Sequence, residues 1–162
     1  LEEAVEIFGK GKVSTHLIVG LGESEREMVE VIQRCVDMSV LPALFAFTPI
    51  KGTTLENGSQ PPVESYRRIQ IARHLIVHGI ARYEDLRFDK GGCVDDFGVD
   101  EQTLRQTTKK SEPFLTSGCP DCNRPYYNEK PSGPLYNYPK DLTEKEFSII
   151  QKELGLMRGT KF

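Results

Sequence analysis

The sequence predicts an α/β fold with parallel strands, and three observations lead to this prediction. Two short runs, 13–19 and 41–47, are rich in apolar and β-branched residues and have the length of buried strands. Each run ends in a turn that contains glycine or proline, and a segment with helical spacing of its apolar residues follows. The strand-helix-strand-helix order is typical of parallel strands joined by right-handed crossovers.

A helix end precedes the first strand. Residues 1–8 mix apolar and acidic positions and are followed by Gly9, a typical C-terminal helix cap. The first strand then runs into the turn Gly20-Leu21-Gly22. Because the chain starts in the last turns of a helix and lacks an initiator Met, we expect the N-terminal part of a longer polypeptide to precede it.

One helix follows each strand. Ser24 and Glu27 form a capping box for a helix that reaches about Met38. The second helix covers residues 63–77, after the proline-containing loop that ends the second strand. We expect the first helix to bury Met28, Val31, Ile32, Cys35 and Val36, and the second to bury Tyr66, Ile69, Ala72 and Ile76. The Arg67-Arg68 pair is expected to be solvated.

Residues 1–80 therefore predict two consecutive βα units of a barrel or an open sheet. Two strands cannot close a barrel, and strands buried on both faces need neighbours. We expect those neighbours in a missing N-terminal half of the same barrel or in another chain.

Residues 81–162 read as a C-terminal extension. A hairpin is expected around Lys90-Gly91-Gly92, and a short helix over 100–110. The stretch 111–141 holds six of the ten prolines, which predicts an ordered tail without regular structure. A last helix, 143–154, is expected to be capped by Thr143 and Glu146 and stopped by Gly155, with Leu142 and Phe147 as a hydrophobic staple.

Composition narrows the class of protein. The 162 residues have a net charge of -3 and 38% hydrophobic residues, which is ordinary for a single globular domain. This charge gives no electrostatic reason to bind nucleic acid or an anionic membrane. No apolar run approaches the roughly 20 residues of a membrane span, and no secretory signal is present. We expect a cytoplasmic protein with no nucleic-acid partner and no membrane association.

The most informative feature is the pair Cys119 and Cys122 in Gly118-Cys-Pro-Asp-Cys-Asn-Arg-Pro125. Two residues between cysteines let a turn direct both sulfurs at one metal ion or cluster, while Pro120 fixes a backbone angle. Soft thiolates suit zinc and iron–sulfur clusters alike, so the pair does not separate the two. The remaining ligands must come from elsewhere.

Other cysteines and histidines are weaker candidates. Cys93, after two glycines, is either a third ligand or a solvent-facing thiol. Cys35 lies on an apolar helix face and is expected to be a core thiol. His74 and His78 have the spacing of a helical metal pair, but they share a face with Arg67 and Gln70, so we favour a solvated surface.

Ile18-x-Gly20-x-x-Glu23 after the first strand resembles the later part of the Gly-x-Ile-x-Gly-x-x-Glu signature of radical S-adenosylmethionine enzymes. His16 stands where that signature has its first glycine. The run from Val13 to Glu25, followed by 44–53, is similar to the second half of the barrel in biotin synthase and its relatives. The resemblance implies the C-terminal part of a partial (βα)6 TIM-type barrel, with an irregular cysteine-bearing extension.

The tail resembles the C-terminal extension of the biotin-synthase-like subgroup that includes the two-component, archaeal-type lipoyl synthases. The matching residues are the run from Gly118 to Pro131 and Leu135-Tyr-Asn-Tyr-Pro139. The resemblance implies a sulfur-insertion enzyme that acts on an octanoyl chain held by a lipoyl carrier protein, with a second radical S-adenosylmethionine subunit as a further partner. Its cofactors would be S-adenosylmethionine and [4Fe-4S] clusters.

The resemblance also implies roles for particular residues. Ile18, Gly20 and Glu23 would shape the nucleoside site, and Cys119 and Cys122 would hold an auxiliary cluster. Lys51 and Arg124 lie beside loops of the expected site, and each is either a surface cation or a contact for the carboxylate of S-adenosylmethionine or for the acidic carrier. The sequence contains no Cys-x3-Cys-x2-Cys run for the radical cluster, so it cannot make the radical alone. Four tyrosines are expected to anchor the tail to the barrel: Tyr126, Tyr127, Tyr136 and Tyr138.

Two alternatives remain open. The first is another reaction on the same scaffold, such as biotin-type or methyl-transfer chemistry, because a fold does not fix its substrate. The second is a non-catalytic binding module in which the Cys119–Cys122 knuckle holds structural zinc with ligands donated by a partner.

Overall fold

Two parallel strands form the main sheet. Strand β1 (Val13–Val19) pairs with β2 (Val40–Ala46), and the register runs from Val13 opposite Val40 to Val19 opposite Ala46. The structure, a computed structural model, describes residues 1–117 and 135–155. The parallel pairing and the first strand are confirmed, while the second strand begins and ends one residue earlier than expected.

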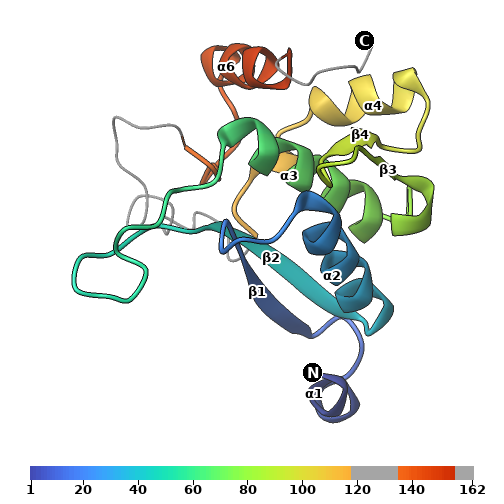
Figure 1. Cartoon of the computed structure of the whole chain (residues 1–162). Helices are drawn as coiled ribbons and strands as arrows, with labels where there is room; N and C mark the ends of the chain where they lie inside the picture. Colours follow the sequence, from blue (N-terminus) through green and yellow to red (C-terminus); the bar gives the residue numbers. More distant parts are fainter. Residues whose placement is uncertain (118–134, 156–162) are drawn as a thin grey trace.

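Helices α2 (Glu25–Asp37) and α3 (Val63–Val77) follow the two strands and lie together on one side of the sheet (Figure 1). The predicted capping box of α2 is present, because the Glu27 amide donates to Ser24 Oγ and the Ser24 amide donates to the Glu27 carboxylate. Helix α1 (Glu2–Phe8) lies near the start of β1, and its C-terminal Gly9 has a φ of 91°. The crossover order is therefore the predicted one.

The buried face of α2 differs from the predicted stripe at one position. Met28, Ile32 and Cys35 are buried as expected, but Val31 is 37% exposed, while Val29 is fully buried. The apolar spacing allows either valine to face the core. Packing against α3 selects Val29.

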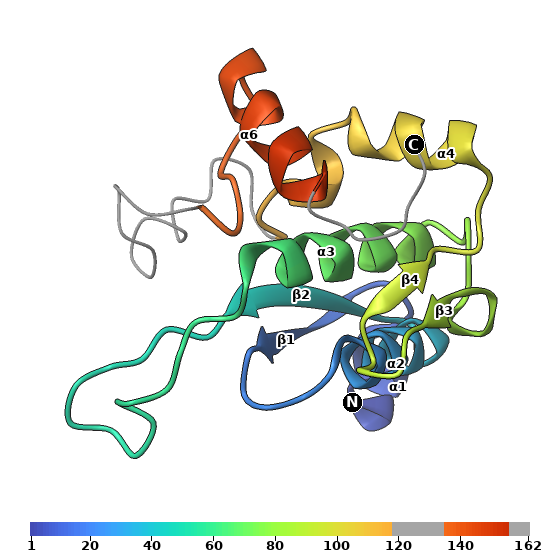
Figure 2. The same cartoon turned by 45° about the horizontal axis from the view of Figure 1, so that its top comes forward.

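Helix α3 is the centre of the described fold. It contacts the sheet and α2 on one side, and the 3-10 turn η2 (Glu112–Phe114) and α6 (Glu144–Gly155) pack on the other side (Figure 2). The predicted solvated face is therefore wrong, because three of its members are buried: Arg67, Gln70 and His74. Arg68 is also largely buried, at 12% side-chain exposure, so the expected solvated arginine pair is wrong as well.

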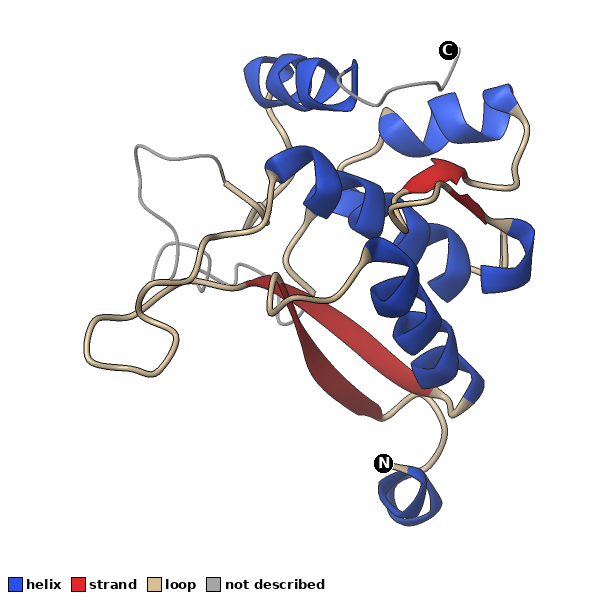
Figure 3. Ribbon diagram, in the orientation of Figure 1, coloured by secondary structure: helices blue, strands red, loops and turns tan. Residues whose placement is uncertain are grey.

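The second half of the described chain adds small elements around α3 (Figure 3). A 3-10 turn, η1 (Tyr83–Asp85), precedes an irregular antiparallel hairpin of β3 (Arg87–Phe88) and β4 (Val94–Asp96). Helix α4 (Glu101–Thr108) is capped by Asp100. The predicted hairpin is confirmed, and so are the helices expected over 100–110 and 143–154, which correspond to α4 and α6. The tail that was expected to be irregular contains the helical turn η2.

The other face of the main sheet carries exposed side chains in the described part of the chain. His16, Ile18 and Leu41 are exposed there, so β1 and β2 are not buried on both faces as expected. The residues that the structure describes form two two-stranded sheets and no closed barrel. Among them, no helix is both long and apolar enough to cross a bilayer.

Candidate functional site

The loop after β1 is shaped by its own glutamate. The Gly20 amide donates to Glu23 Oε1 at 2.7 Å, and the Leu21 amide donates to Glu23 Oε2 at 2.9 Å. Both carboxylate oxygens thus accept backbone hydrogen bonds of the strand-to-helix turn. Glu23 therefore fixes the path of the chain between β1 and α2, at the end of the sheet where parallel α/β folds bind ligands.

Gly20 lies so close to Pro61 that a side chain on it would clash. Its φ is 104°, in the region that favours glycine, and a Cβ built on it would lie 2.9 Å from Cδ of Pro61. Pro61 belongs to the loop that leads into α3. The glycine therefore lets the loops after β1 and β2 touch.

We expect Gly20→Ala to lower the free energy of unfolding by about 2 kcal/mol, because it combines backbone strain with a clash against Pro61. Gly22→Ala is the matched control. Gly22 has a similar φ of 115° but no atom near its Cβ position, so it should lose only about 1 kcal/mol. Urea unfolding of the two variants gives the comparison. Equal losses would show that the contact with Pro61 contributes nothing.

A shallow groove of about 290 Å³ lies on the open face of the sheet. Its lining includes His16 and Ile18 of β1 and Phe45 of β2. The rings of His16 and Phe45 meet edge to face with centroids 4.8 Å apart, and Ile18 is 46% exposed. The groove thus joins an apolar floor to one imidazole, a surface that suits a flat ring.

Lys51 is not among the residues that line the groove or bond to Glu23. It is exposed in the long loop between β2 and α3, where Thr53 Oγ1 donates to the Ile50 carbonyl and the Gly52 amide donates to Glu56. Within the described part of the chain, Lys51 forms no ion pair. Its proposed role as a ligand cation stays a prediction.

The predicted metal ligands Cys119 and Cys122 lie outside the described residues, and so does Arg124. Cys35 is a buried free thiol of the core, as expected. Burial raises the pKa of Cys35, which keeps it protonated. Across residues 1–117 and 135–155, no three His, Cys, Asp or Glu side chains gather as a metal site.

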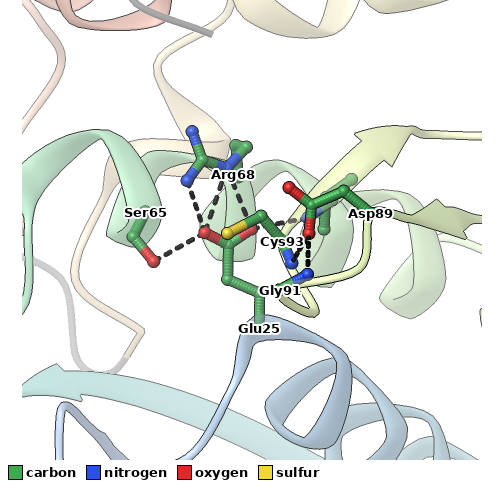
Figure 4. A network of polar contacts seen from close by, with 7 residues as sticks. Glu25, Ser65, Arg68, Asp89, Gly91 and Cys93 are labelled. Atoms are coloured by element: carbon green, nitrogen blue, oxygen red, sulfur yellow. Dashed lines mark hydrogen bonds and ion pairs between the residues drawn. The ribbon is translucent and has the colours of Figure 1, made fainter. Parts of the chain in front are cut away.

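Cys93 lies beside a buried ion pair (Figure 4). The Glu25 carboxylate is 5% exposed and accepts two hydrogen bonds from Arg68 Nε and one from its Nη2. Burial raises the pKa of Cys93, and the charge of Glu25 raises it further. Cys93 is thus a half-buried thiol rather than the solvent-facing thiol that was the alternative, and a role as third cluster ligand stays a prediction.

Glu25 joins three segments that are distant in sequence. Besides Arg68 of α3, it accepts hydrogen bonds from Ser65 Oγ at 2.7 Å and from the Val94 amide of the hairpin at 2.8 Å. The Gly92 carbonyl accepts from the Arg26 amide at 2.9 Å, so the hairpin also contacts the first turn of α2. The network thus holds the start of α2, and with it the Gly20–Glu23 turn, against α3.

The segment 135–138 is buried against α3 and β2. Tyr136 Oη donates to the Pro61 carbonyl at 2.7 Å, and Asn137 Nδ2 donates to Tyr66 Oη and to the Leu44 carbonyl. Tyr136 and Tyr138 are 3% and 4% exposed, which confirms them as anchors of the tail. Tyr126 and Tyr127 lie outside the described residues.

Arg67 is the fully buried cation of this anchor. Its Nε lies 2.8 Å from Glu153 Oε2, and its Nη1 donates to Gln70 Oε1 and to the Tyr136 carbonyl. Nη2 donates to the Leu135 carbonyl. A guanidinium with every nitrogen engaged holds α6 and the tail against α3 at the same time.

The two edges of the main sheet differ in the hydrogen bonds of their outward backbone groups. The Phe47 amide donates to the Val19 carbonyl, so the backbone groups of Phe47 point toward β1. Backbone groups of successive residues in a strand point to opposite sides, so the carbonyls of Pro42 and Leu44 point to the outer edge of β2. Arg73 Nε donates to the Pro42 carbonyl and Asn137 to the Leu44 carbonyl. Pro42 also lacks an amide donor. The β2 edge is therefore closed to further pairing.

The β1 edge presents backbone groups that are ready to pair. By the same alternation, the amides and carbonyls of Ser14, His16 and Ile18 point away from β2. In the described part of the chain these groups form no hydrogen bond. Beside this edge, α1 exposes the apolar side chains Ile7 and Phe8. This side of the fold is suited to a further strand.

Comparison with known proteins adds no family to this description. No protein-family model matches the chain, and neither a curated protein nor a solved structure matches it significantly.

Sequence reasoning overlooked the residues that hold the site together. Pro42 carries a signal that could have been used, since proline within a strand pattern indicates an edge. Glu25, Arg67 and Asn137 carry none, because their partners are up to 93 residues away in the chain.

Proposed function

We propose that the chain is the C-terminal part of a radical S-adenosylmethionine enzyme that inserts sulfur into an octanoyl chain on a lipoyl carrier protein. The family assignment rests on the sequence resemblance of the β1 loop and of the cysteine-bearing tail. The unequal sheet edges are the structural observation that carries the proposal.

A sheet of two parallel strands needs neighbours, because parallel strands are stable mainly inside larger sheets. Here one edge is closed by Pro42, Arg73 and Asn137, while the outward amides and carbonyls of the other edge form no hydrogen bond with the residues that the structure describes. The closed edge has the features of a terminal strand. The open edge suits the preceding strand of a partial barrel, which would come from the N-terminal half of the same enzyme.

The groove and the β1 loop fit a nucleoside ligand. Ile18 offers an exposed apolar surface, and Gly20 lets the β1 loop pack against Pro61 of the loop after β2. Glu23 is engaged by the loop amides, so it would shape the site rather than contact the ligand. His16 lines the same groove and would contact the ring of the ligand.

The cofactors would supply the chemistry that these side chains cannot. When bound, a [4Fe-4S] cluster with S-adenosylmethionine would supply radical chemistry for hydrogen removal from the substrate, and an auxiliary cluster would supply the sulfur. Cys119 and Cys122 are the proposed ligands of the auxiliary cluster, because thiolates are the usual ligands of iron–sulfur clusters. The protein groups would bind and orient S-adenosylmethionine and exclude water.

The base of the cysteine-bearing segment is held firmly, which favours a positioning role. The Thr116 amide donates to the Tyr138 carbonyl at 2.9 Å, and the Tyr138 amide donates to the Phe114 carbonyl at 2.9 Å. Asn137, next to this base, contacts the edge of β2, and Tyr136 contacts Pro61 of the loop after β2. The segment therefore starts and returns beside the strand whose loop lines the groove.

We expect the natural polypeptide that contains this sequence to bind iron and sulfide when it is purified without oxygen. Replacing Cys119 and Cys122 together by alanine should remove roughly half of the iron, since one of two clusters would lose its ligands. Iron, sulfide and zinc analysis measures this, together with the visible absorption. Cys35→Ala is the matched control, because this core thiol should leave the iron content unchanged.

The alternatives give other results in the same experiment. A colourless protein that contains zinc, which the double replacement removes, would support the zinc-knuckle module and contradict an iron–sulfur enzyme. Unchanged iron and zinc in the double variant would contradict metal binding by the two cysteines. The product formed from S-adenosylmethionine and substrate separates sulfur insertion from biotin-type or methyl-transfer chemistry.

A further inference from the structure

Helix α3 carries a histidine pair whose two members differ in exposure. His74 is 6% exposed, beneath the outer layer, while His78, one turn later, is exposed. Their rings lie against each other, with centroids 4.3 Å apart and planes inclined by 47°. Residues four apart on a helix share one face, so the helix itself holds the two imidazoles together.

The imidazole of His74 is an unusual buried group. Within the described part of the chain, neither of its nitrogens forms a hydrogen bond, although buried polar side chains are nearly always hydrogen-bonded. The neighbouring Gln70 and Arg67 on the same helix have protein partners at each of their side-chain nitrogens. Among the described residues, His74 is thus a buried imidazole whose nitrogens are available to a ligand.

The electrostatic environment keeps His74 neutral. Burial, with a smaller contribution from the nearby His78, lowers the pKa of His74 to about 4. Lys110 and Arg73 act in the same direction, while Glu112 of η2 opposes them. A neutral imidazole has a free nitrogen lone pair at physiological pH, which is the form that binds a metal ion.

We propose that His74 and His78 bind a divalent transition-metal ion of the zinc type through their imidazole nitrogens. Imidazole is a favoured ligand of Zn²⁺, Cu²⁺ and Ni²⁺. The buried His74 would provide the fixed ligand, and the exposed His78 would complete a chelate at the surface. Since no third ligand gathers there among the described residues, water would fill the other positions, and the ion would exchange with solvent. This inference is independent of the proposed function.

The experiment titrates Zn²⁺ into the chain with Cys119 and Cys122 replaced by alanine, so that thiolates do not compete. We expect one site by calorimetry. His78→Ala should weaken binding at least about tenfold, since loss of even an outer-shell partner costs roughly 10- to 100-fold. His78 is exposed, so the variant should remain folded. His74→Gln should have the same effect, and circular dichroism would verify its fold.

His16→Ala is the matched control, because His16 is the one remaining histidine of the sequence. It should leave the affinity for Zn²⁺ unchanged. Co²⁺ provides a second readout, since its visible spectrum reports its ligands and should change in His78→Ala. The proposal is overturned if the cysteine-free chain does not bind Zn²⁺, if both His78→Ala and His74→Gln bind like that chain, or if His16→Ala alone removes binding.

Discussion

Replacing Arg67 by alanine should lower the free energy of unfolding by about 3 to 5 kcal/mol, the usual effect of removing one partner of a buried ion pair. The fully buried guanidinium contacts Glu153, Gln70 and two carbonyls of the tail. It also lies over the rings of Phe114 and Tyr138, at 5.8 and 5.6 Å from their centroids. Alanine would remove the donors that Arg67 offers to Glu153, Gln70 and the Leu135 carbonyl, while the Tyr136 carbonyl would still accept from Gln70 Nε2.

Urea unfolding measures this loss, and two further variants serve as comparisons. Arg105→Ala removes an exposed i,i+4 pair with Glu101 and should change stability by less than about 0.5 kcal/mol. Arg67→Lys should restore little, because an ammonium cannot reproduce the planar set of donors. A small loss in Arg67→Ala, similar to that of Arg105→Ala, would show that the contacts of Arg67 contribute little to holding the tail and α6.

After Arg67→Ala, Glu25→Ala should have the largest effect on stability, lowering the free energy of unfolding by about 3 kcal/mol. It would leave Arg68 as a largely buried cation without its carboxylate, and it would remove the acceptor of Ser65 Oγ and of the Val94 amide. Because these partners belong to α3 and to the hairpin, the hairpin should loosen from the helices before the whole chain unfolds.

Hydrogen exchange distinguishes this local effect from a general one. In Glu25→Ala the Val94 amide should exchange faster than the amides in the middle of β2, whose hydrogen bonds to β1 remain. Glu84→Ala is the control, because it removes an exposed pair with Arg82 and should change stability only slightly. Equal acceleration of all amides in Glu25→Ala would contradict a local role for the network.

Features that depend on neighbouring residues could be predicted from the sequence. The Ser24–Glu27 capping box, the Gly9 cap and the lengths of β1 and α3 each depend on positions within a few residues. Local propensity and hydrogen-bonding groups determine such features. The parallel pairing of the strands also followed, because strand–helix alternation leaves few other arrangements.

Features that depend on the tail could not be predicted in this way. Arg67, Gln70 and His74 look like a polar helix face, and they would be one if 135–155 did not pack on it. A periodic pattern reports which residues are apolar, not which polar residues receive partners from far along the chain. Likewise, Val29 and Val31 are equivalent in the pattern of α2, and only the position of α3 separates them.

The candidate site also contains some features that the sequence predicts and others that it does not. The Gly20–Glu23 turn has the local form that its sequence suggests, although Glu23 points back to its own loop rather than outward. The exposure of Ile18 depends on an open sheet face that no local pattern reveals. The assignment of the cysteine pair to a metal depends on chemistry alone, because Cys119 and Cys122 lie outside the described residues.

The hydrogen bonds between Thr116 and Tyr138 and between Tyr138 and Phe114 have a consequence for how this protein can change during evolution. They fasten the two ends of the intervening stretch at one point, so the rest of the chain does not depend on its length. Doubling a closed loop costs only about 0.6 kcal/mol. A change in the number of residues between 117 and 135 would therefore cost little, as long as the buried contacts of Tyr136 and Asn137 are kept.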